Sequence, residues 1–147
     1  MNEYTFSNLK IGMEEKFSYT VTQEKQNLFT QLSGDLNPMH LDADYADRML
    51  GLNGHTTNGG GLVYGMLTAS LYSTFAGVYL PGKYCLLQHV ETTFVKPVAI
   101  GDCLTVCGKI IEKDESFMRI KVKINVLNQN NEKVCRGVLV AGVLKGL

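Results

Sequence analysis

An uncharged segment runs from Gly59 to Gly82 and reads GGGLVYGMLTASLYSTFAGVYLPG. No Asp, Glu, Lys or Arg occurs between Met49 and Gly82, so this segment must lie inside the protein or cross a membrane. Apolar residues recur on every side of a helix over Leu62–Ala76, and Gly77 followed by Pro81-Gly82 closes the helix. Because small polar residues and tyrosines interrupt the segment, it favours a buried core helix over a membrane span.

One side of this helix carries only small residues. Gly65, Ala69, Ser73 and Ala76 follow one another at helical spacing. Such a stripe leaves room for a sheet to pack closely or for a ligand to lie against the helix, and the pattern leaves both readings open.

The residues before the helix predict a strand and a helical excursion. Residues 15–21 alternate as a first strand, and Thr22 caps a helix whose apolar side carries Leu28, Phe29 and Leu32. The segment from Asp35 to Asp42 contains a proline and several turn-forming residues, which predicts an ordered loop. Asp42 then caps a short helix that reaches residue 49, and a glycine-rich loop follows over residues 50–61.

After the uncharged helix the period changes to that of strands. Four segments alternate and are rich in β-branched residues: 84–95, 103–111, 117–127 and 133–144. We expect them to form an antiparallel sheet connected by hairpins, with a bend or an edge at Pro97. One face of such a sheet needs cover, and the uncharged helix is the element apolar enough to provide it. The sequence therefore predicts an α+β fold, with residues 1–147 as one domain.

Composition narrows the class of partner. Acidic and basic residues balance at 14 each and no run of Lys or Arg occurs, which argues against nucleic acid or an anionic membrane as the partner. The charged amino terminus does not resemble a signal peptide, so we expect a cytoplasmic protein. The four cysteines form no Cys-x-x-Cys pair, and we interpret them as reduced core residues rather than metal ligands.

Two groups could perform chemistry. Asp35 and His40 face each other if Pro38 turns the loop back, and a carboxylate and an imidazole that share a water form an acid–base pair. The alternative is that Asp35 is a cap or turn residue and that His40 is only its hydrogen-bonded partner, without a role in chemistry. Gly65, at the start of the helix, has no side chain to block a carbonyl oxygen from reaching the free first-turn amides, although a glycine kept for packing explains the residue equally well.

Five motifs, in this order, resemble the MaoC-like, (R)-specific enoyl-CoA hydratases and dehydratases. They are SGDLNPMHLD at 33–42, GML at 65–67, LPG at 80–82, FVKPV at 94–98 and GD at 101–102. The resemblance covers nearly the whole chain and implies a hot dog fold, in which an antiparallel sheet wraps a long helix.

The resemblance also implies a site. In the family, the aspartate and histidine that match Asp35 and His40 hold the reacting water, and the amide that matches Gly65 binds the thioester carbonyl. The stripe through Ser73 and Ala76 then lines the acyl pocket. The amide of Asn37 would orient the loop or the substrate, and we expect Tyr64, beside Gly65, to bind the substrate as well. Members of the family usually have a histidine in place of Tyr64 and a shorter link in place of residues 50–61.

These residues lead to a hypothesis of function. We expect a lyase of fatty acid metabolism that interconverts trans-2-enoyl and (R)-3-hydroxyacyl thioesters, with coenzyme A or acyl carrier protein as the carrier and no further cofactor or metal. The resemblance implies a homodimer or a higher homo-oligomer. The alternatives are a hot dog acyl-CoA thioesterase, a non-catalytic protein that binds acyl thioesters, and a purely structural partner.

Overall fold

The computed structural model describes residues 1–51 and 60–144. The predicted loop over residues 50–61, with His55, therefore lies largely outside the described residues. The chain begins with a short 3-10 turn, η1 (Phe6–Asn8), and then follows the predicted order of strand, helical excursion, central helix and four strands.

The central helix is α4 (Gly65–Thr74), which continues without a break into the π-helical turn η2 (Phe75–Tyr79). The start at Gly65 is confirmed, although the apolar pattern already begins at Leu62, whose amide donates to the carbonyl of Met39 at 2.8 Å. Gly77 does not end the helix, because it lies within η2. The helix ends at Tyr79, just before the predicted Pro81-Gly82, where a proline cannot donate a backbone hydrogen bond.

Five antiparallel strands form one sheet in the order β1-β3-β4-β5-β2. They are β1 (Glu14–Thr20), β2 (Cys85–Phe94), β3 (Cys103–Asp114), β4 (Arg119–Leu127) and β5 (Lys133–Val143). All five predicted strands are confirmed, but a hairpin between β2 and β3 is not formed. The segment around Pro97 carries the chain away from β2, so that β3 pairs with β1 and β2 pairs with β5 at the opposite edge.

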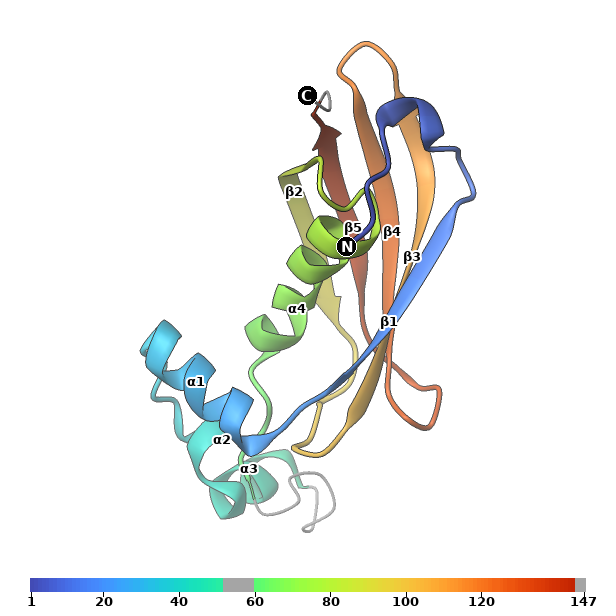
Figure 1. Cartoon of the computed structure of the whole chain (residues 1–147). Helices are drawn as coiled ribbons and strands as arrows, with labels where there is room; N and C mark the ends of the chain where they lie inside the picture. Colours follow the sequence, from blue (N-terminus) through green and yellow to red (C-terminus); the bar gives the residue numbers. More distant parts are fainter. Residues whose placement is uncertain (52–59, 145–147) are drawn as a thin grey trace.

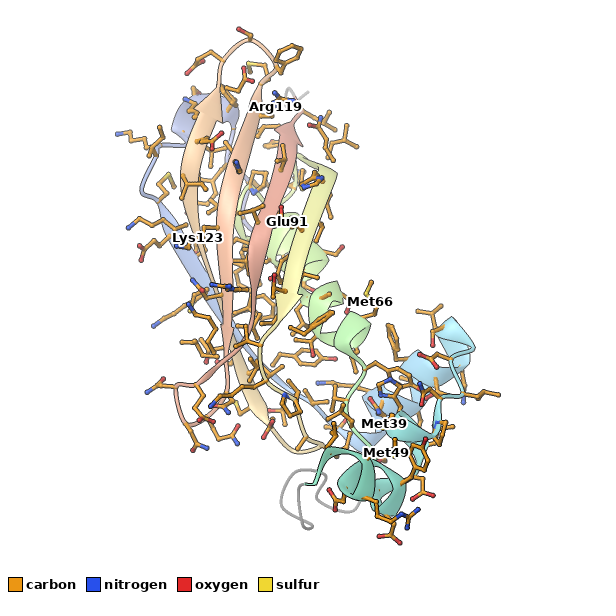
Figure 2. The ribbon with its side chains drawn as sticks, turned by 180° about the vertical axis from the view of Figure 1, so that it is seen from behind. Met39, Met49, Met66, Glu91, Arg119 and Lys123 are labelled. Atoms are coloured by element: carbon orange, nitrogen blue, oxygen red, sulfur yellow. The ribbon has the colours of Figure 1, made fainter. Side chains whose placement is uncertain are left out.

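The core lies between α4 and the face of the sheet that it covers (Figure 1). Alternate residues of β3 and β4 point into it and are fully buried: Leu104, Val106, Ile110, Ile120, Val122, Ile124 and Val126. Phe75 of η2 packs against Gly108, where an added Cβ would stand 2.3 Å from the ring. The expected cover of the sheet by the uncharged helix is thereby confirmed. The opposite face carries charged side chains such as Glu91 and Lys123 (Figure 2).

Three helices form an arm that projects from one end of the sheet (Figure 1). They are α1 (Gln23–Ser33), α2 (Pro38–Leu41) and α3 (Ala43–Leu50). The predicted caps are confirmed, since Thr22 accepts from the amide of Lys25 and Asp42 accepts from that of Tyr45. The segment expected to be a loop contains α2, because Pro38 occupies the first helical position and Asn37 caps the turn.

The apolar side predicted for α1 is confirmed for Phe29, which packs against the core, and is wrong for Leu28 and Leu32. Leu28 and Leu32 are 57% and 83% exposed, whereas Gln26 is only 1% exposed. The arm does not lie on the sheet, so the buried side of α1 is set by its contact with α2 and with the extended segment before α4.

The four cysteines are free, and they differ in burial. Cys135 is buried as expected, Cys85 and Cys107 are half-buried, and Cys103 is exposed, so the interpretation of all four as core residues is wrong for Cys103. Over residues 1–51 and 60–144, no three His, Cys, Asp or Glu side chains gather closely enough to hold a metal ion. Within the same ranges no helix is long and apolar enough to cross a membrane.

Candidate active site

His40 is fixed by the backbone of a segment far along the chain. Its Nδ1 lies 2.7 Å from the carbonyl oxygen of Leu62, three residues before the first residue of α4. A carbonyl oxygen can only accept, so Nδ1 of the neutral imidazole carries the hydrogen. The other ring nitrogen, Nε2, is therefore left as the hydrogen-bond acceptor of His40.

Asp35 is held by the turn that begins α2. Its Oδ1 accepts from the amide of Asn37 at 3.0 Å, and its own amide donates to the hydroxyl of Ser33 at 3.2 Å. The Asn37 side chain in turn accepts from the amide of Met39 at 3.0 Å. These short-range bonds fix the carboxylate and assign Asn37 the role of a helix cap. Asp35 itself is exposed.

A hollow of about 540 Å³ brings the predicted residues together. Its lining comes from α1, the Asp35 turn, α2, the start of α4 and the end of β2: Phe29, Ser33, Asp35, His40, Tyr64, Gly65, Met66 and Phe94. Met66 stands on the side of α4 that faces the arm (Figure 2). Asp35 and His40 come from one segment of the sequence and Tyr64 and Gly65 from another, and the four residues share one space.

A second hollow, of about 370 Å³, lies next to the first and is mainly apolar. It is lined by His40, Leu50, Leu62, Val63, Gly65, Thr68, Phe94, Val95, Lys96, Pro97, Val98 and Val134. The two hollows share His40, Gly65 and Phe94, and the Phe94 ring forms a wall of both. The first hollow thus holds the ionisable groups, and the second offers an apolar space that begins at the same histidine.

Gly65 is the first residue of α4, and no side chain caps this end of the helix. The amides of the first turn have no partner within the helix, and the helix dipole makes this end positive. The Phe94 ring lies against Gly65, so that an added Cβ would stand 3.0 to 3.2 Å from three ring atoms. Only glycine leaves the ring in place and the amide open to the hollows.

Ser73 is not brought to this place. It lies two turns further along α4, it is exposed, and it lines neither hollow. Ala76, the next residue of the small stripe, is 1% exposed and packs in the core. The stripe therefore diverges: Gly65 faces the site, Ala69 and Ala76 pack inward, and Ser73 points to the surface.

A family model described as "MaoC like domain" matches residues 6–132. The chain belongs to this MaoC-like family. Its curated relatives include an (R)-specific enoyl-CoA hydratase from Rhodospirillum rubrum, 32% identical over 112 residues that make up 74% of this chain and 73% of the relative. A second (R)-specific enoyl-CoA hydratase, from Aeromonas caviae, is 34% identical over 67% of this chain and 68% of its own length.

Solved structures agree with the MaoC-like fold. An R-hydratase of Pseudomonas aeruginosa superposes with a TM-score of 0.83 at 27% identity, covering 97% of this chain and 86% of that one. The (R)-hydratase of Aeromonas caviae gives a TM-score of 0.80 at 27% identity, covering 92% and 97%. The MaoC-like chain therefore has the α+β hot dog fold that the resemblance implied.

The sequence did not assign two residues to the site. Phe94 begins the FVKPV motif, but only its placement at the end of β2 brings its ring to Gly65. Gln26 reads as a solvent-facing residue of α1, yet its Nε2 donates to the carbonyls of Leu62 at 3.0 Å and His40 at 3.3 Å. Gln26 thus holds the same carbonyl that orients the imidazole.

Proposed function

We propose that this MaoC-like protein reversibly hydrates trans-2-enoyl thioesters to (R)-3-hydroxyacyl thioesters. The observation that carries the proposal is the convergence of the Asp35 carboxylate, the His40 imidazole and the Gly65 end of α4 on one hollow. A water held between two acceptors, beside donors for a developing oxyanion, is the arrangement that addition of water to an enoyl thioester requires.

The hydrogen bond of His40 Nδ1 supports the following roles. His40 Nε2 takes a proton from the water as its oxygen bonds to the β-carbon, and the imidazolium then returns that proton to the α-carbon. The Asp35 carboxylate accepts a hydrogen bond from the second O–H of the water, which stays on the product hydroxyl, and its negative charge stabilises the imidazolium. Negative charge that develops on the thioester oxygen is stabilised by the Gly65 amide and the helix dipole, a contribution of about 3 kcal/mol in comparable sites.

The apolar hollow supports an acyl substrate. Its walls next to His40 are almost entirely aliphatic and aromatic, which suits a hydrocarbon chain whose β-carbon lies at the imidazole. The carrier is coenzyme A or acyl carrier protein. Among the relatives, the names of the bacterial proteins specify enoyl-CoA, and a tomato relative, 35% identical over 64% of this chain, is named a 3-hydroxyacyl-[acyl-carrier-protein] dehydratase.

A second copy of the chain supports the site in this proposal. β2 is an edge strand, and its apolar side chains are exposed, with Leu86 at 51%, Val90 at 40% and Phe94 at 49%. An apolar unpaired edge is stable in water only when it is covered, and pairing with the same edge of a second copy covers it.

The test is the loss of enoyl-thioester absorbance when the purified protein is mixed with crotonyl-CoA. We expect hydration by the wild type and a loss of at least about 100-fold in Asp35→Asn. Asp42→Asn is the matched control, because Asp42 lies on the same loop and only caps α3. A wild type that leaves the absorbance unchanged contradicts the proposal, and release of free thiol from saturated acyl-CoA would indicate a thioesterase instead.

A further inference from the structure

Tyr64 connects the two members of the acid–base pair. Its hydroxyl donates to the main-chain carbonyl of Asp35 at 2.7 Å. Its ring lies against the imidazole of His40, with 3.9 Å between the ring centroids and 31° between the planes. One side chain therefore contacts the backbone beneath the carboxylate and the face of the histidine.

The phenol group is fully engaged with the protein. Because a carbonyl oxygen only accepts, Tyr64 uses its single hydroxyl hydrogen on Asp35, and its oxygen is left to accept. That oxygen lies 2.9 Å from the hydroxyl of Thr30 on α1, whose one hydrogen also lies within reach of the Gln26 carbonyl at 3.0 Å. Tyr64 is 2% exposed, and the Phe29 ring also packs against its ring, with 5.2 Å between centroids. The hydroxyl is thus committed to protein groups rather than directed at a substrate.

The position of Tyr64 in the chain adds a third connection. It directly precedes Gly65 and caps the backbone of α4, so movement of the residue also moves the amides at the start of the helix. The Asp35 turn is tied to the rest of the protein chiefly by short-range bonds, and the Tyr64 hydroxyl is its bond to the central helix.

We infer that Tyr64 is a positioning residue that sets the Asp35 carboxylate and the His40 imidazole at their working separation. The inference rests on the proposed function and replaces the substrate contact expected for Tyr64 from the sequence. It predicts that the hydroxyl matters for the rate of the chemical step and not for the affinity of the thioester, because displacement of reacting groups by about 1 Å costs up to roughly 100-fold.

Tyr64→Phe tests the inference, since it removes the hydroxyl and keeps the ring against His40. We expect kcat for crotonyl-CoA to fall by about 10- to 100-fold while KM stays within about twofold. The factor should be the same for a trans-2-octenoyl thioester, because a positioning residue does not contact the acyl chain. Tyr79→Phe is the control, as Tyr79 stacks on Phe17 at the far end of the helix.

A second measurement does not depend on activity. Hydrogen–deuterium exchange is followed in peptides that cover residues 34–41, where the amides of Asn37, Met39 and His40 are hydrogen-bonded. We expect faster exchange there in Tyr64→Phe and unchanged exchange in Tyr79→Phe.

The outcomes separate the two proposals. A rise in KM with kcat preserved, or a loss that depends on acyl length, would assign Tyr64 to substrate binding and overturn the inference. Exchange in residues 34–41 that equals the wild type would overturn it as well. If the wild type shows no hydration, the proposed function fails, and the exchange measurement alone then decides whether Tyr64 holds the loop.

Discussion

The imidazole of His40 donates from Nδ1 to the carbonyl oxygen of Leu62, a residue that lies 22 positions later in the chain. This bond fixes the tautomer and presents Nε2 to the hollow that also contains Asp35. The chemistry proposed for His40 therefore depends on a backbone group that the sequence does not mark, and the bond itself suggests how to separate structure from catalysis.

His40→Asn should fold and lose activity. The Asn amide occupies the place of Nδ1 and still donates to Leu62, whereas nothing replaces Nε2. We expect hydration of crotonyl-CoA to fall by about 10² to 10⁴ with thermal unfolding that remains cooperative. His89→Asn, on the exposed edge strand, serves as the control. Activity within tenfold of the wild type would show that Nε2 of His40 carries no proton in the reaction.

Gln26→Leu should destabilise the protein. The substitution removes two donors from a side chain that is 1% exposed, and the carbonyls of Leu62 and His40 lose those bonds inside the protein. We expect the free energy of unfolding to fall by about 1 to 3 kcal/mol, measured by urea denaturation. Gln31→Leu, at an exposed position of the same helix, should change it little. Equal urea midpoints of unfolding for Gln26→Leu and the wild type would show that the hydrogen bonds from Gln26 to Leu62 and His40 do not stabilise the protein.

Phe94→Ala should broaden the range of acyl chains accepted. The ring forms the wall shared by the two hollows, so its removal joins them. We expect kcat/KM for a trans-2-octenoyl thioester, relative to crotonyl-CoA, to rise by roughly tenfold. Leu86→Ala removes an apolar side chain from the same strand at a distance from both hollows and controls for changes at the exposed edge. An unchanged ratio in Phe94→Ala would exclude the ring as a determinant of chain length.

Cys85 should resist alkylation at pH 8. Burial disfavours the charged thiolate and raises the pKa of Cys85 to about 11, so only about one thiol in a thousand is ionised at that pH. Cys103 is exposed. Iodoacetamide followed by peptide mass spectrometry should therefore label Cys103 well before Cys85 in the folded protein. Equal labelling rates would show that the half-buried thiol is far more accessible or more acidic than its surroundings imply.

Much of the fold is encoded in local patterns. Strand periodicity placed β1 to β5 correctly, and the caps at Thr22 and Asp42 follow from short side chains that compete for backbone amides. The pairing of β2 with β5 is not encoded locally, because alternation shows which faces are apolar and not which strand lies beside which. For the same reason, the exposure of Leu32 and the burial of Gln26 depend on where the arm packs.

The site likewise combines residues that the sequence indicates with residues that only the fold brings together. Asp35 and His40 are close in sequence, and the expected turn at Pro38 brings them to one hollow. The Leu62 carbonyl and the Phe94 ring reach that hollow from distant segments. A backbone group carries no mark in the sequence, and the FVKPV motif does not show that the Phe94 ring lies against Gly65. The structure thus adds the supporting groups around a pair that the sequence already indicated.

The central claim is that Asp35 and His40 act together on one water. The measurement that tests it most directly is kcat/KM for crotonyl-CoA hydration in the wild type, Asp35→Asn, His40→Asn and the double variant. Two groups that act as a unit predict a loss of at least about 100-fold in each single variant and little further loss in the double variant. Single variants that keep more than a tenth of the activity, or losses that multiply in the double variant, would contradict the account.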